Sequence, residues 1–254
     1  MTGLEQLTVL FAGLGAGILT STVGVASLLS FPVLVAVGLP PVVANTSNTV
    51  GMTPAGLSGS FGYRAELRAH PGVTATVLVT CAAGAVAGAF LLLALDPRVF
   101  EAVVPWLILL ACLLVGIQPT VSSYLRRRHG HEVRPDRTSM SPVTTFFAAL
   151  TGVYGGYFGA GSGVMMVAVL GFGLDLDLRI VNALKTLAVL AANLVASLIF
   201  LVVAELDWGA VALLAGGSVV GGYVGSHIGR RLPATLFRVL IVLAGVTAAA
   251  LMLV

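Results

Sequence analysis

Long apolar stretches alternate with short polar loops along the whole of this chain. Each stretch is long enough for a helix to cross the hydrocarbon core of a bilayer, which takes about 20 residues. The stretches run over residues 7–38, 42–62, 72–95, 99–118, 143–172, 180–204, 208–229 and 233–254. This pattern predicts an all-α polytopic membrane protein, with the lipid bilayer as its surroundings.

The apolar pattern occurs twice, in the same order. Residues 11–38 align with residues 146–173, and the later parts of the copies align after a two-residue insertion in the second. The matched pairs include Gly17 and Gly152, Gly24 and Gly159, Ser27 and Ser162, Asn45 and Asn182, and Thr49 and Thr186. The chain is therefore predicted to contain two structural repeats.

The loops between the matched stretches carry opposite charges in the two copies. Arg64 and Arg68 of the first copy correspond to Glu205 and Asp207 of the second. Cytoplasmic loops of membrane proteins are enriched in Lys and Arg, so loops of opposite charge are expected on opposite sides. A second repeat that is turned over in the membrane produces this reversal. We therefore predict two inverted-topology repeats.

A basic segment separates the two copies. The predicted segments are membrane repeat 1 (residues 1–118), a basic cytoplasmic linker (119–141) and membrane repeat 2 (142–254). The linker contains Arg126, Arg127 and Arg128, and the positive-inside rule places it in the cytoplasm. His129 and His131 lie in it as well, but no Cys or carboxylate cluster accompanies them, so no metal site is predicted.

Counting membrane crossings requires a break in each long apolar block. With the linker inside and Glu205 outside, residues 143–204 must cross the membrane an odd number of times. Two ordinary helices there would place Glu205 on the wrong side. We predict five helices per repeat, the second of them short and following a glycine-rich break, with both termini outside. The alternative is eight plain spans with both termini inside.

The composition agrees with a membrane protein. Hydrophobic residues make up 58% and charged residues 9% of the chain, against about 25% charged in soluble domains. The net charge of +3 comes from loop residues, so it does not predict nucleic-acid binding. Cys81 and Cys112 lie inside predicted spans and are interpreted as small apolar residues. No Lys or Arg precedes the first apolar run, so we expect that span to be retained.

The strongest local signal is the glycine-rich run 155–163. Gly155, Gly159 and Gly163 recur every four residues and predict a smooth helix face for close packing. Gly161 adds backbone freedom that a uniform helix does not need. A helix break here would point backbone N–H groups into the protein and form an anion site. Helix packing alone is the alternative explanation.

The first copy repeats this signal with Gly24 and Ser27. Ser27 and Ser162 stand where the N-cap of the following helix is expected, and either hydroxyl could also bind a ligand. The presence of matched breaks in both copies favours a functional role over packing alone.

A stripe of polar residues forms the second signal. Asn182, Thr186, Asn193 and Ser197 are spaced by four, seven and four residues, so they share one helix face. The first copy has Asn45 and Thr49 at the matching places, and Asn48 in the place of Lys185. Polar side chains on a membrane helix must point inwards. Interhelical hydrogen bonds, worth about 0.6 kcal/mol each, are the alternative to ligand binding.

Lys185 needs a negatively charged partner. A cation near the centre of a bilayer costs about 2.5–3.5 kcal/mol, and the neighbouring spans supply no matching carboxylate. An anionic ligand would provide the missing charge. Alternatively, the side chain extends to the membrane surface, since Arg179 precedes it closely.

The motifs in both copies resemble those of the TauE/SafE sulfite exporter family. They are Gly38-Leu39-Pro40-Pro41, the run Val43–Ser47, the run Gly159–Gly163 and Glu205-Leu206-Asp207-Trp208. The resemblance spans nearly the whole chain outside the linker. It implies transport of small sulfur oxyanions or organosulfonates across the plasma membrane of a prokaryote. The usual triple glycine of copy one is replaced by Val25, Ala26 and Ser27, which leaves the particular substrate open.

We therefore predict a secondary transporter that exports sulfite, a sulfonate or a related anion by alternating access, with its site at the repeat interface. The inside-negative potential favours outward anion movement by about 2.3 kcal/mol per charge per 100 mV. The predicted substrate-binding residues are Gly24, Ser27, Asn45, Asn48, Thr49, Gly159, Gly161, Ser162, Asn182, Lys185 and Thr186. No metal or cofactor is predicted, and a homodimer is compatible with the sequence.

Two other functions stay open. One is an uptake permease for a different small anion. The other, less favoured, is an intramembrane enzyme, which would need a clustered nucleophile and base or metal ligands at membrane depth. One lysine and one histidine far apart in the spans do not supply such a cluster.

Overall fold

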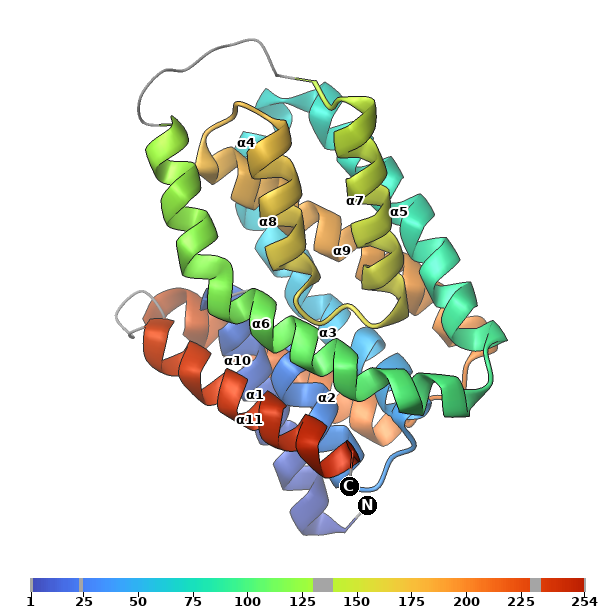
Figure 1. Cartoon of the computed structure of the whole chain (residues 1–254). Coiled ribbons are helices and arrows are strands. Elements are labelled where there is room, and N and C mark those ends of the chain that lie inside the picture. The colour runs from blue at the N-terminus through green and yellow to red at the C-terminus, as the bar shows by residue number, and fades with distance from the viewer. Residues whose placement is uncertain (1, 23–24, 130–138, 229–233, 254) are drawn as a thin grey trace.

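The computed structural model describes residues 2–22, 25–129, 139–228 and 234–253, and these form an all-α bundle (Figure 1). The first half contains α1 (Gly3–Thr22), α2 (Ser27–Ala36), α3 (Pro41–Gly62), α4 (Arg64–Ala69), α5 (Pro71–Ala94) and α6 (Pro97–His129). The second half contains α7 (Pro142–Tyr157), α8 (Ser162–Gly173), α9 (Leu178–Val203), α10 (Trp208–Ile228) and α11 (Ala234–Leu253).

The predicted break and short second helix are present in both halves. α2 has 10 residues and α8 has 12, so each is about 15–18 Å long and too short to cross the membrane alone. Within the described residues, α1, α5, α6 and α9 are long and apolar enough to span a membrane. The arrangement of eight plain spans is therefore wrong.

Two segments that the sequence assigned to loop or linker are helical. Residues 64–69 form the short helix α4, and α6 continues through Pro119 to His129 into the predicted linker. The extension of α6 is held by packing, because Leu125 is fully buried against Gly171 of α8. Tyr124 adds a ring contact with Phe172, with centroids 5.9 Å apart.

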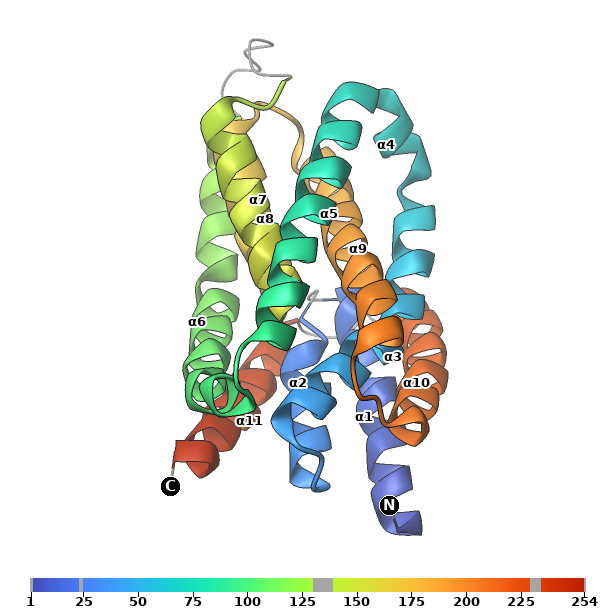
Figure 2. The ribbon, with the colours of Figure 1, turned by 90° about the vertical axis from the view of Figure 1, so that its right-hand side faces the viewer.

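The central helices of the bundle are α3 and α9, which contact each other (Figure 1). The neighbours of each helix in one half correspond to those of its counterpart in the other. α1 packs on α10 as α7 packs on α5, and α3 packs on α10 as α9 packs on α5. Figure 2 shows α1 and α2 in the lower half of the molecule and α7 and α8 in the upper half. Two inverted repeats would give this arrangement, but the repeat relationship stays a prediction.

Glycines allow α5 and α7 to pack backbone against backbone. A Cβ on Gly88 would collide with the carbonyl oxygen of Val153, and one on Gly156 would collide with that of Ala85. Gly17 and Gly221 permit an equally close contact between α1 and α10. Such small residues are what membrane helices need in order to approach closely.

The packing face predicted from Gly155, Gly159 and Gly163 is wrong. α7 ends at Tyr157, so the last two of these glycines lie beyond the helix. The close contacts on α7 come instead from Gly152 and Gly156.

The two ends of the bundle differ in charge. We call the end at which α4 lies and α7 begins the basic end (Figure 1). It carries Arg64 and Arg68 of α4, and Arg179 at the start of α9, which contacts α4. The opposite end, at which α5 and α9 end, carries Asp96 and Glu205 and is called the acidic end. The side of the membrane on which each end lies stays a prediction.

Candidate anion site

The connection between α7 and α8 is a tight break formed by residues 158–161. Gly159 and Gly161 have φ angles of +80° and +79°, a conformation that favours glycine. The N–H groups of Phe158 and Gly159 both donate to the carbonyl oxygen of Tyr154, at 2.9 Å. The Tyr154 hydroxyl donates to the carbonyl oxygen of Ala160 at 2.6 Å, so the break is braced from within α7.

The two serines at the breaks are not N-caps, which corrects the sequence prediction. Ser162 is the first residue of α8, and its N-cap is Gly161 in the left-handed conformation. Ser27 likewise begins α2 after Ala26. Neither N-cap residue makes a side-chain capping hydrogen bond, so these helix N-termini are capped by no side chain of the described residues.

The break leaves hydrogen-bond donors available. Within the described part of the chain, the N–H groups of Ala160, Gly161 and Gly163 have no acceptor. Ser162 is 5% exposed, and its hydroxyl has no hydrogen-bond partner among those residues either. Successive free N–H groups at a helix N-terminus form a concave anion-binding surface and place a partial positive charge there.

A small cavity lies where the two halves meet. Its volume is about 60 Å³, and both breaks line it. The lining residues are Thr20, Val25, Ala26, Ser27, Met52, Gly56, Gly159, Gly161, Ser162, Val189 and Asn193. None of these residues is acidic or basic, so the hydroxyl, amide and backbone N–H groups define its polarity.

Four of the predicted binding residues line this cavity: Ser27, Gly159, Gly161 and Ser162. Gly24 lies outside the described residues, so the structure does not place it. The other six, Asn45, Asn48, Thr49, Asn182, Lys185 and Thr186, are not among the residues that line it.

On α3, the predicted binding residues bond to other protein groups. The Asn45 amide donates to the carbonyl oxygen of Tyr157 at 2.9 Å, and its own Oδ1 is buried without a partner among the described residues. Asn48 Oδ1 accepts a hydrogen bond from the Ser30 hydroxyl at 2.5 Å. The Thr49 hydroxyl donates to the carbonyl oxygen of Asn45 in its own helix. These three residues do not line the cavity.

On α9, the predicted binding residues bond within their own helix or make no hydrogen bond to the described residues. Asn182 donates to the carbonyl oxygen of Leu178, and Thr186 donates to that of Asn182. Lys185 is half-buried and forms no ion pair with any described carboxylate. The described ion pair joins Arg179 to Glu66 at 2.5 Å, with the Arg179 side chain 79% exposed.

Asn193 was recognised as part of the polar stripe but was left out of the predicted binding residues. It lines the cavity, and its amide has no partner among the described residues. Met52, Gly56 and Val189 line the cavity as well. The helical spacing of the stripe could have found Asn193 and Gly56, because they occupy matched positions in the two copies.

Aromatic rings pack beside the break. Phe158 forms edge-to-face contacts with Phe31 of α2 and Phe100 of α6, with centroids 5.3 Å and 6.3 Å apart. Tyr157 contacts Phe100 as well, at 5.5 Å. Phe31 and Phe100 are each 1% exposed, so the cluster fills the space between α2, α6 and the break.

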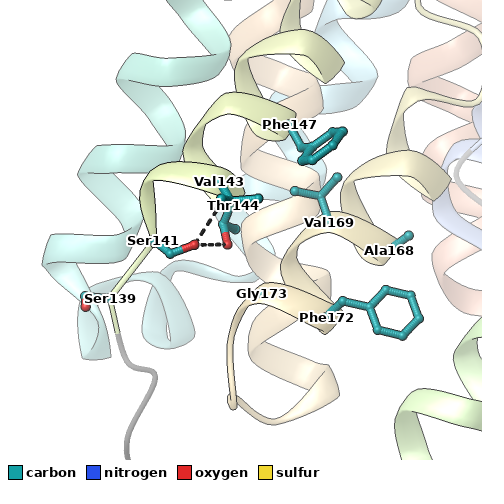
Figure 3. A pocket seen from close by; sticks show the side chains of 9 residues that line it. All are labelled: Ser139, Ser141, Val143, Thr144, Phe147, Ala168, Val169, Phe172 and Gly173. Carbon is teal, nitrogen blue, oxygen red and sulfur yellow. Dashed lines mark hydrogen bonds between the residues drawn. The ribbon is translucent and has the colours of Figure 1, made fainter.

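A larger groove of about 770 Å³ lies between α7 and α8 and is separate from the cavity (Figure 3). Figure 3 shows Ser141 and Thr144 joined by hydrogen bonds, with Phe147 and Phe172 along its wall. None of the predicted binding residues lines this groove.

Comparison with known proteins identifies the family. The family model described as "Sulfite exporter TauE/SafE" matches residues 9–252. The chain belongs to the TauE/SafE family. This TauE/SafE protein is 25% identical to a "Probable membrane transporter protein" of Haemophilus influenzae over 246 residues, covering 95% of the present chain and 92% of that protein.

A second relative of this TauE/SafE protein comes from Sinorhizobium. It is named "Probable membrane transporter protein ORF9" and is 26% identical over 239 residues, covering 92% of the present chain and 87% of its own length. No solved structure matches this TauE/SafE chain. The family and these relatives identify the chain as a membrane transporter, and they do not assign its substrate.

Proposed function

We propose that this protein is a secondary transporter that exports a small sulfur oxyanion, such as sulfite, or a sulfonate across the plasma membrane of a prokaryote. The observation that carries the proposal is the set of unpaired donors around the cavity between the two breaks. The N–H group of Gly161, the Ser162 hydroxyl and the Asn193 amide would replace part of the water shell of an anion. The family membership supports transport as the activity.

The position of the cavity supports an alternating-access mechanism. The cavity is lined by both halves of the chain, at two interrupted helices. Transporters of inverted-repeat folds bind their substrates at such a place, and rocking of one repeat against the other exposes the site to each side in turn. Lipid is the required environment, and a homodimer stays a prediction.

The charge of the substrate favours export as the direction of transport. An inside-negative potential drives an anion outwards by about 2.3 kcal/mol per charge per 100 mV, so export requires no coupling ion. No carboxylate of the described residues lines the cavity, which supports this choice over proton-coupled uptake through the same site. Uptake of a different anion is the alternative.

The direct test is flux of sulfite and of short sulfonates through proteoliposomes containing the full chain. We expect Ser162→Ala to raise KM roughly tenfold or more, because a hydrogen bond to a charged group contributes about 1.5–3 kcal/mol. Ser60→Ala is the matched control: Ser60 is 8% exposed, its hydroxyl also lacks a partner among the described residues, and it does not line the cavity. The proposal fails if no small anion is transported, or if both variants behave like the unmodified protein.

A further inference from the structure

The matched polar residues of α3 and α9 differ in exposure. Asn45 and Asn48 are each 1% exposed and Thr49 is 8% exposed. Their counterparts Asn182, Lys185 and Thr186 are all partly exposed. The two sets of matched residues therefore occupy different environments in this structure.

Each polar stripe leads to the cavity along one helix face. On α9, Val189 and Asn193 line the cavity, and Thr186 and Asn182 continue the same face towards the basic end. From Asn193 to Asn182 the face extends roughly 16 Å at 1.5 Å per residue.

On α3, Met52 and Gly56 line the cavity, and Thr49 and Asn45 continue the face towards the acidic end. The cavity therefore lies between two polar helix faces. The face on α9 runs to the basic end of the bundle, and the face on α3 runs to the acidic end.

Hydrogen bonds join α3 to neighbouring elements at the acidic end. Asn45 bonds to the end of α7, and Asn48 bonds to Ser30 of α2. The Thr46 hydroxyl donates to the carbonyl oxygen of Glu205, and the Ser47 hydroxyl accepts a hydrogen bond from the N–H of Asp207, at 3.0 Å and 2.9 Å.

The aromatic cluster of Phe31, Phe100, Tyr157 and Phe158 packs beside these bonds. Asn182 and Lys185, which correspond to Asn45 and Asn48, make no such bonds to another element within the described residues.

The partly exposed face of α9 that carries Lys185 belongs to a helix with neighbours on several sides. α9 packs against α3, α4, α5, α7 and α8, and Lys185 is on the same side as the cavity-lining Val189. A lysine ammonium group needs water or an anion around it. We therefore interpret the partial exposure of Asn182, Lys185 and Thr186 as contact with water rather than with lipid.

We propose that this conformation opens the cavity to the basic end along the Asn182–Lys185–Thr186 face of α9 and closes it at the acidic end, and that Lys185 draws the anion into the cavity from the basic end. This rests on the proposed function, since the route along α9 leads to the same anion site. In the opposite conformation the α3 residues become accessible and the bonds of Asn45 and Asn48 to α7 and α2 break.

Thr49 and Thr186 provide a matched test of access. Each hydroxyl donates to the carbonyl oxygen four residues earlier, so removing either costs the same local bond. In a Cys81→Ala, Cys112→Ala background, Thr49→Cys and Thr186→Cys are labelled with a membrane-impermeant maleimide from each side of the membrane. Ser123→Cys, exposed on α6 near the basic end, identifies the side.

We expect Thr186→Cys to react at least tenfold faster than Thr49→Cys, from the side that labels Ser123→Cys, and sulfite to slow the reaction. Equal rates, or faster labelling of Thr49→Cys, would overturn the proposal. Labelling is measured on protein that elutes as a single species in detergent, so a misfolded variant is recognised before it is interpreted.

Lys185 is tested by its effect on each side separately. We expect Lys185→Met to raise KM for sulfite presented at the basic end by tenfold or more, to leave KM at the acidic end within twofold, and to be rescued by Lys185→Arg. An equal rise on both sides would contradict the role given to Lys185. If no anion is transported by any variant while the labelling contrast holds, the proposed function fails but the access route stands.

Discussion

The side-chain amide of Asn45 in α3 donates a hydrogen bond to the carbonyl oxygen of Tyr157, the last residue of α7, at 2.9 Å. This bond joins the first half of the chain to the break in the second half, across 112 positions of sequence. Asn182, the residue at the matching position in the second half, donates to Leu178 in its own helix instead. Asn45 therefore positions the break that carries the candidate anion site.

Asn45→Ala should destabilise the protein more than Asn182→Ala. Removing the Asn45 amide leaves the partly buried Tyr157 carbonyl oxygen without this partner, which costs about 1–3 kcal/mol. Asn182 bonds to its own helix and is partly exposed, so its loss should cost less than about 1 kcal/mol. Thermal unfolding of both variants in the same detergent measures the difference. Equal shifts in Tm would contradict the role of Asn45.

Gly161→Ala should impair anion binding beyond its cost in stability. Gly161 has a φ of +79°, and a Cβ there would lie 3.3 Å from the Cβ of Ala111. Forcing a side chain into this conformation costs about 1–2 kcal/mol and would shift the free N–H groups of the break.

Gly38→Ala is the control for backbone strain. Gly38 has a φ of +92°, a Cβ added to it would meet no atom within 4 Å, and it does not line the cavity. We expect both variants to lose stability, and Gly161→Ala alone to raise KM for sulfite. A similar KM for both variants would show that the break does not bind the anion.

Gly88→Ala should disturb the contact between α5 and α7. The added methyl group would collide with the backbone of Val153, and overpacking of this kind costs about 1–3 kcal/mol. Gly116→Ala on α6 has open space around it and should be neutral or stabilising, since alanine favours helix over glycine. Unfolding of the two variants, compared side by side, checks this. A stable Gly88→Ala protein would mean that the two helices can separate without loss.

Leu125→Ala tests why α6 extends beyond the predicted span. Leu125 is fully buried against Gly171, and truncating such a leucine costs about 2–5 kcal/mol. Leu113→Ala, on the same helix but 60% exposed, should cost much less. Protease cleavage within residues 119–129 gives a local measurement, and we expect it to accelerate in Leu125→Ala. Unchanged cleavage would mean that α6 is stable there without this contact.

Much of the architecture could be predicted from the sequence because it depends on local patterns. Apolar length defined the spans, and the odd number of crossings required by Glu205 predicted a short helix after each break, as α2 and α8 show. The helical structure of α4 and of the end of α6 was not predicted, because a segment rich in polar residues has the sequence pattern of a loop. The tertiary contacts that make it helical cannot be deduced from that pattern. Leu125 is apolar in a basic segment, and its contact with Gly171 comes from another helix.

The binding residues were predicted less well, and the reason is geometric. Helical spacing places Asn45, Asn182 and Asn193 on equivalent helix faces. It does not determine which of their polar groups form hydrogen bonds with neighbouring helices. The Asn45 amide donates to the Tyr157 carbonyl oxygen, whereas Asn193 lines the cavity.

The sequence by itself determined the membrane environment, the paired helix breaks and the separation of charge between the two ends, because each follows from composition and spacing along one segment. The tertiary structure alone decided which donors are free. Asn45 and Asn48 are buried and bond to other segments, whereas their counterparts Asn182 and Lys185 are partly exposed and make no such bonds within the described residues. Two copies of one pattern can occupy different environments, because packing between helices, not local sequence, determines which polar groups are paired.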